Sequence, residues 1–234
     1  MHNEINQVIR YSPIIKYIIE HKPQKILEIW SWSQGIWRFL DIDFDWLDLT
    51  SSDYGIDENE TYKGMNFIKW SALNIPLKDN LYDFVYSCDM LEHIPPQLRE
   101  KAVCEAIRVC KKWWYVVFCF PCWLIAKTFD YILFIFFKFI SYFSEKHIPW
   151  RLEEHMEIGY PSKSWVNKIV ERLKKDWLHC NDYSANNIFW RSIIMIIDMA
   201  KCLKLQNIII NAYVKKPRLS KSFLPYRKYL IIQK

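Results

Sequence analysis

The sequence predicts an α/β protein with a Rossmann-like, doubly wound and mostly parallel sheet, an antiparallel C-terminal strand and a helical insertion after strand five. Three observations predict this fold class. Short apolar runs recur along the first half of the chain. The intervals between them are long enough for the crossovers that parallel strands require. Residues 95–109 also read as a helix that begins with proline.

The first half begins with an expected helix over residues 5–21, because its apolar residues follow helical spacing until Pro23. Five strands follow, which we expect at 25–29, 46–49, 65–68, 82–86 and 115–120. Together they form the parallel part of the sheet.

The second half is less regular. Helices are expected at 123–143, 163–174 and 188–203, and strands at 207–214 and 226–232. His155 lies among three glutamates, so residues 153–157 read as a solvated charged loop, with an acceptor pocket or a metal site as alternatives.

The composition of the chain excludes some classes of protein. With 51% hydrophobic and 25% charged residues among 234, the chain is too apolar to be disordered. The net charge of +6 comes from basic residues spread along the chain, and we expect no nucleic-acid partner. Seven scattered cysteines and no signal-like start predict a cytoplasmic location. The Cys119–Cys122 pair reads as buried thiols, so no metal site is predicted.

Glycine and tryptophan occur in abnormal numbers. The chain has 4 glycines and 12 tryptophans. Average usage predicts roughly 16 glycines in a chain of this length, and the tryptophans make up the difference.

The turn after the first expected strand reads Glu28-Ile29-Trp30-Ser31-Trp32-Ser33-Gln34-Gly35. With glycine at 30 and 32 it would be an acidic residue followed by GxGxxG, a turn that needs glycine for positive φ and close approach to a ligand. Asp48 follows Glu28 by about 20 residues. A nucleotide-binding sheet has a ribose-binding carboxylate at this spacing, at the tip of strand two.

Two later segments complete a series of motifs, Ile68 to Pro76 and Tyr82 to Pro95, the second ending in Asp-Met-Leu-Glu-His-Ile-Pro. With them, residues 24–120 resemble the class I S-adenosylmethionine-dependent methyltransferases that act on small molecules and lipids. The resemblance implies S-adenosylmethionine as cofactor. The positions that match the family's cofactor contacts are Glu28, Trp30, Ser31 and Trp32 for the methionine part, Asp48 for the ribose, Ser71 and Ala72 for the adenine, and Cys88 and Asp89 for the methyl-donating end.

Two features qualify this set. The family usually has aspartate where this chain has Ser71. No catalytic residue is assigned, because transfer to a nucleophilic acceptor depends mainly on alignment. His93 reads as a loop histidine, with a general base as the alternative.

The departures from the family's sequence pattern are mostly of one kind, with tryptophan in place of glycine. Positions 30, 32, 46, 70, 113 and 114 all carry tryptophan where the family commonly has glycine. We therefore hypothesise that UGA codons, read as glycine in the source organism, were translated here as tryptophan. Trp165 fits a helix pattern and reads as genuine. If all are genuine, the indoles would fill the cofactor cleft.

The expected function is methyl transfer from S-adenosylmethionine to an unidentified small-molecule or lipid-like acceptor. A cofactor-blind binding or membrane-associated module is the alternative. A nicotinamide-dependent oxidoreductase fits less well, since no Tyr/Lys or His/Asp catalytic set is evident. We expect one domain over 1–234, divided into an N-terminal helix (1–23), a cofactor-binding half (24–120), an aromatic helical insertion or lid (121–160) and C-terminal helices and closing strands (161–234).

The aromatic segment 123–143 bears on the acceptor. Its polar residues Lys127, Asp130, Lys138 and Ser141 fall near one helical face, and residues 131–137 carry no charge. This uncharged run is too short to span a bilayer. A helix at a membrane surface, a roof over an apolar pocket and a core helix all stay open. Peripheral membrane contact through 123–143 is therefore one expectation, with the protein cytoplasmic or at the membrane surface.

Overall fold

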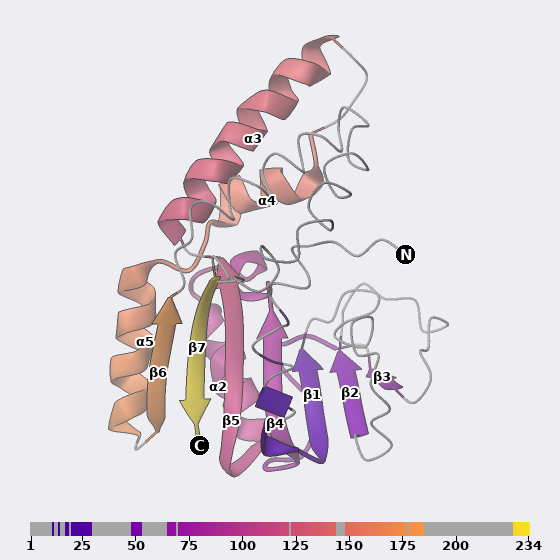
Figure 1. Cartoon of the computed structure of the whole chain (residues 1–234), viewed down its shortest axis with the longest axis vertical. Coiled ribbons are helices and arrows are strands. Elements are labelled where there is room, and N and C mark those ends of the chain that lie inside the picture. The colour runs from indigo at the N-terminus through magenta and orange to yellow at the C-terminus, as the bar shows by residue number, and fades with distance from the viewer. Residues whose placement is uncertain are drawn as a thin grey trace.

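The computed structural model describes residues 11, 14, 17–18, 20–29, 48–52, 65–68, 70–121, 123–143, 148–176, 178–184 and 227–234. Within them lies a seven-stranded sheet in the order β3-β2-β1-β4-β5-β7-β6 (Figure 1). The parallel strands are β1 (Lys25–Ile29), β2 (Asp48–Ser52), β3 (Met65–Ile68), β4 (Tyr82–Cys88) and β5 (Cys110–Pro121). β7 (Arg227–Gln233) pairs antiparallel with both β5 and β6 (His179–Ser184).

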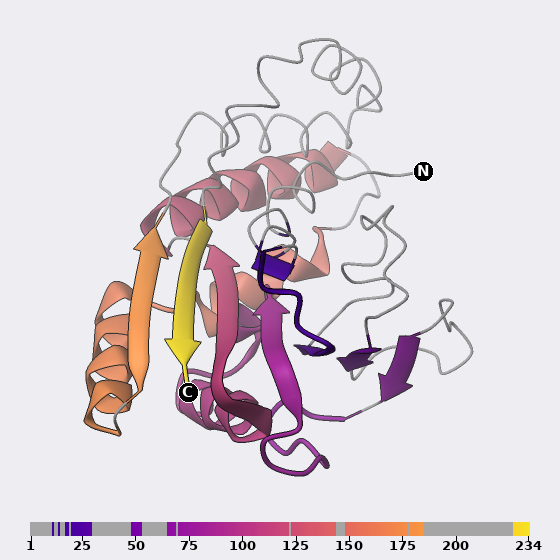
Figure 2. The same ribbon diagram turned by 60° about the horizontal axis from the view of Figure 1, so that its bottom comes forward.

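Helical elements among the described residues connect or cover these strands, and five of them have defined bounds. They are the 3₁₀ turn η3 (Leu91–His93) and the helices α2 (Arg99–Val109), α3 (Trp123–Phe143), α4 (Trp150–Ile158) and α5 (Lys163–Lys175). Figure 1 shows α3 extending beyond the carboxyl ends of the parallel strands and away from the sheet, Figure 2 shows the helix beyond the same strand ends, and it packs against α4.

The two faces of the sheet bury separate cores, because successive strand residues point to opposite sides. Leu27 and Val85 face the apolar sides of α2 and α5. Ile26 and Phe84 face the helical residues that the structure describes between positions 11 and 18. Helices thus cover both faces of the sheet, which confirms the doubly wound α/β class.

Several elements have the bounds that the sequence predicts, namely 25–29, 65–68 and 123–143. The edge strand β6 was not predicted, because His-Cys-Asn-Asp-Tyr-Ser contains no apolar run. The predicted helix at 188–203 and strand at 207–214 lie outside the described residues.

The position predicted for Asp48 is wrong. β2 begins at Asp48, which pairs with Lys25 at the start of β1, and ends at Ser52, which pairs with Ile29. Asp48 therefore lies at the amino end of its strand. The error arose because Thr50, Ser51 and Ser52 extend the strand although they interrupt the apolar run. Threonine favours strands through its branched β-carbon.

The charged loop predicted around His155 is also wrong, since this segment forms α4. His155 is buried while Glu153 and Glu157 are exposed, so the charges mark the outer face of an amphipathic helix.

Candidate functional site at the carboxyl ends of the strands

The carboxyl ends of the parallel strands meet at one edge of the sheet. Ile29 of β1 pairs with Ser52 of β2 and with Ser87 of β4, and Cys88 of β4 pairs with Cys119 of β5. The Ser87 hydroxyl also donates to the Ile29 carbonyl at 2.7 Å. The strand order reverses between β1 and β4, and open α/β sheets bind ligands at such switch points.

Asp89 follows β4 directly at this edge. Its φ is +58°, a left-handed conformation that aspartate tolerates better than most residues, and its N–H donates to the Cys119 carbonyl at 2.9 Å. The side chain is only 9% exposed. A largely buried carboxylate at the switch point fits a ligand with a positive charge.

Glu28 lies one residue before the end of β1 and is buried inside the sheet. The Tyr11 hydroxyl donates to its carboxylate at 2.9 Å. Tyr86 is its register partner on β4, and burial together with the negative charge of Glu28 raises the pKa of the Tyr86 hydroxyl. The Glu28 carboxylate is therefore held by a hydrogen bond from Tyr11, on the face of the sheet that the N-terminal helical residues cover.

Ser71 and Ala72 form the turn after β3. The Leu73 N–H donates to the Ser71 hydroxyl at 3.2 Å, and Ser71 is exposed. Ala72 is buried in the same core cluster as Met90 and Leu91. The loop after β3 thus packs against the loop after β4.

The predicted cofactor residues lie in four places. Cys88 and Asp89 lie at the sheet edge, and Glu28 lies one residue before the end of β1. Ser71 and Ala72 form the turn after β3, and Ala72 belongs to the core beside that edge. Asp48 lies at the opposite edge. The segment 30–32, with Trp30, Ser31 and Trp32, lies outside the described residues.

Arg99 was not predicted as a site residue. Its Nε donates to the Leu91 and Ile94 carbonyls at 2.7 and 2.9 Å, and a terminal nitrogen donates to the carbonyl of Gly159, at the end of α4. Burial lowers the pKa of Arg99, and the nearby Glu92 carboxylate opposes that shift. The guanidinium therefore ties the loop after β4 to the helical insertion.

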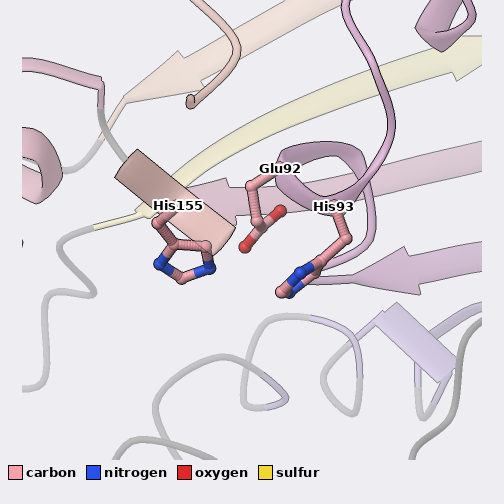
Figure 3. Close-up of side chains that lie close together, drawn as sticks. All are labelled: Glu92, His93 and His155. Atoms are coloured by element: carbon pink, nitrogen blue, oxygen red, sulfur yellow. The ribbon is translucent and has the colours of Figure 1, made fainter. Parts of the chain in front are cut away.

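A buried polar cluster lies where η3, α3 and α4 meet (Figure 3). His155 Nδ1 lies 3.0 Å from Asp130 Oδ2, and the Tyr160 hydroxyl donates to the same carboxylate. His93 Nδ1 lies 2.9 Å from Glu154 Oε2. Burial lowers the pKa of His93, and Glu154 offsets this only in part.

The sequence contained one signal for this cluster. Asp130 is the only acidic residue within α3, and a carboxylate among apolar residues needs a buried partner. The sequence grouped Asp130 with Lys127 and Lys138 on one face. The structure corrects this, because Asp130 is buried and both lysines are exposed.

The tryptophans at predicted glycine positions have unusual environments. Trp113 has a φ of +72°, close to the +74° of Gly159, and its side chain is 81% exposed. Trp70 is buried with no hydrogen-bond partner for its indole N–H among the described residues. Trp165, by contrast, packs against the core from α5. The first two positions suit glycine better than tryptophan.

Comparison with known proteins agrees with this geometry. Residues 33–118 match the family model of a methyltransferase domain. This part of the chain is therefore similar to a methyltransferase domain. Its sheet order and switch point are those of the class I fold, and S-adenosylmethionine is the cofactor of this class.

Solved structures share the fold at low sequence identity. A plantazolicin methyltransferase in complex with a triazolic desmethylPZN analogue and S-adenosylhomocysteine is 11% identical, with a TM-score of 0.62 over 100% of this chain and 86% of that one. Phosphoethanolamine N-methyltransferase 2 of Haemonchus contortus, in complex with S-adenosylmethionine, is 12% identical, with a TM-score of 0.58 over 96% of this chain and 52% of that one. A comparison with curated proteins finds no match.

Proposed function

We propose that this methyltransferase transfers the methyl group of S-adenosylmethionine to a small, lipid-like acceptor that enters beneath α3. The proposal rests on the position of α3, an aromatic helix that begins after β5 and extends beyond the carboxyl ends of the strands (Figure 1). An apolar acceptor would find hydrophobic surface on this helix.

The described residues fit the cofactor at one end. When bound, S-adenosylmethionine supplies a methyl group on a positively charged sulfur and leaves as a neutral thioether. Asp89 would attract this positive charge, because its carboxylate lies at the switch point and is screened from water. The hydrogen bond between Ser87 and Ile29 would keep the two strand ends together beneath the cofactor.

The ribose contact belongs to a different residue from the one the spacing indicated. Because β2 ends at Ser52, the acidic residue that follows its carboxyl end in the sequence is Asp53. We assign the ribose hydroxyls to Asp53 in place of Asp48.

Positions 30, 32, 46, 70, 113 and 114 are glycines in the native protein under this proposal. The left-handed backbone at Trp113 and the unpaired indole at Trp70 support it. A glycine at 30 and at 32 would leave room for close approach of the cofactor to the turn after β1.

The acceptor class follows from the outer face of α3. Seven large apolar residues of this helix are exposed, namely Leu124, Tyr131, Ile132, Ile135, Phe139, Tyr142 and Phe143. Most of them repeat at intervals of three, four or seven residues and so form one stripe. Lys127 and Lys138 are also exposed and could contact anionic head groups. None of the described helices is long and apolar enough to cross a bilayer. The stripe therefore suits contact with a membrane surface, where lipid-like acceptors reside.

Flotation with phosphatidylglycerol vesicles tests this proposal. I135E and F139E place charge in the stripe and should reduce the vesicle-bound fraction several-fold, since each removes apolar surface from the interface. S164E adds the same charge on the exposed side of α5 and serves as the control. Equal binding by all three variants would contradict the proposed membrane contact.

A further inference from the structure

Three buried side chains from two distant segments converge beneath the helical insertion. Glu92 and His93 belong to η3, and His155 belongs to α4. One ligand atom from each lies within 4.8 Å of the others. Figure 3 shows the three side chains gathered in one small region. Their exposed fractions are 1%, 9% and 7%, so the cluster is screened from solvent.

Both imidazoles have a carboxylate beside Nδ1. Asp130 Oδ2 lies 3.0 Å from His155 Nδ1, and Glu154 Oε2 lies 2.9 Å from His93 Nδ1. At His155, hydrogen bonding to Asp130 holds the proton on Nδ1 and leaves a lone pair on Nε2. Metal-binding histidines in proteins are oriented in this way.

The second ring nitrogen of His155, Nε2, is buried and lacks a hydrogen-bond partner among the described residues. A buried polar atom without a partner is destabilising, so native proteins rarely keep one unless something occupies it. The cluster around it offers two imidazoles and one carboxylate.

We propose that Glu92, His93 and His155 bind one divalent first-row transition-metal ion, with Zn²⁺ or Fe²⁺ as the class of ion that this donor set suits. Two imidazoles and a carboxylate are a recurrent ligand set for such ions, and three protein ligands leave a position open. Asp130 would orient His155 through its hydrogen bond to Nδ1, and the negative charge of Glu154 lies beside His93. The ion would join the loop after β4 to α4.

A purely hydrogen-bonded cluster is the alternative. In that case Asp130, His155 and Tyr160 would only anchor α4 to α3, and the protein would show no preference for metal. The unpaired Nε2 favours the metal site, because hydrogen bonding among the described residues does not satisfy that atom.

Cobalt titration of the intact chain tests the proposal. After treatment with chelator, Co²⁺ should bind at about one equivalent with visible d–d absorption, Zn²⁺ should displace it, and either ion should raise the melting temperature. H155Q and E92Q should abolish saturable binding. D130N should weaken it by about 10- to 100-fold, since it removes only the orienting carboxylate.

H179Q is the matched control, because His179 is an exposed histidine on β6. It should bind Co²⁺ as the parent does. Circular dichroism of the metal-free variants checks their folding, and if H155Q fails to fold, E92Q and D130N still decide the matter. Absence of saturable binding, a thiolate-to-cobalt absorption band, or binding unaffected by E92Q and D130N would overturn the proposal. None of these readouts depends on methyl transfer.

Discussion

At the scale of single residues, Trp113 has a backbone conformation that tryptophan rarely adopts. A left-handed φ costs a residue with a β-carbon roughly 1–2 kcal/mol, and glycine avoids that cost. Trp113 is 81% exposed, so it has little packing to lose. Gly159 has a similarly positive φ, which glycine adopts without strain.

W113G should therefore raise the free energy of unfolding by about 1 kcal/mol, measured by urea denaturation. W165A is the control, because Trp165 packs against the core, and it should lower the free energy by about 1–3 kcal/mol. Loss of stability in W113G would count against a native glycine at this position.

The ribose assignment also concerns single residues. In a background that carries glycine at 30 and 32, D53N should weaken S-adenosylhomocysteine binding by about tenfold or more, because a charged hydrogen bond is worth roughly 1.5–3 kcal/mol. D48N should leave affinity unchanged, since Asp48 lies at the opposite end of β2. Titration calorimetry measures both. A larger effect of D48N than of D53N would restore the original assignment.

At the scale of elements, the sequence predicted long apolar segments well and polar ones poorly. The aromatic helix 123–143 and the strand 25–29 have their predicted bounds, because uninterrupted apolar patterns define them. The polar strand β6 and the charged helix α4 were not predicted, since their character depends on neighbours distant in sequence. The same limit applies to the cluster of Glu92, His93 and His155. Spacing in the sequence alone does not predict that two segments about 60 residues apart come into contact.

Arg99 joins the loop after β4 to the end of α4, and its substitution tests how these two elements are held together. R99K keeps the charge but loses the planar fork that reaches three carbonyls, so it should lower the free energy of unfolding by about 2–3 kcal/mol. Hydrogen exchange over residues 150–159 should also become faster. K101A, an exposed substitution on the same helix, should change stability by less than about 0.5 kcal/mol. Unchanged exchange in R99K would show that Arg99 does not hold α4.

At the scale of the whole molecule, fold and cofactor class were predictable from the order of motifs along residues 24–120. The strand order and the switch point between β1 and β4 confirm the class I architecture. The acceptor was not predictable, because under the proposed function it depends on the three-dimensional arrangement of α3, α4 and the loop after β4. Under the proposed function, cofactor binding depends on residues 30–32, where glycine and tryptophan predict opposite behaviour.

The most direct measurement is calorimetric titration of S-adenosylhomocysteine into two proteins, the tryptophan-containing chain and its W30G/W32G variant. We expect saturable one-to-one binding in the micromolar range by the glycine variant. Binding by the tryptophan form should be at least tenfold weaker, because indoles at 30 and 32 would block close approach of the cofactor. A folded W30G/W32G variant that releases no heat of binding would contradict cofactor binding at this site and favour a cofactor-blind binding protein.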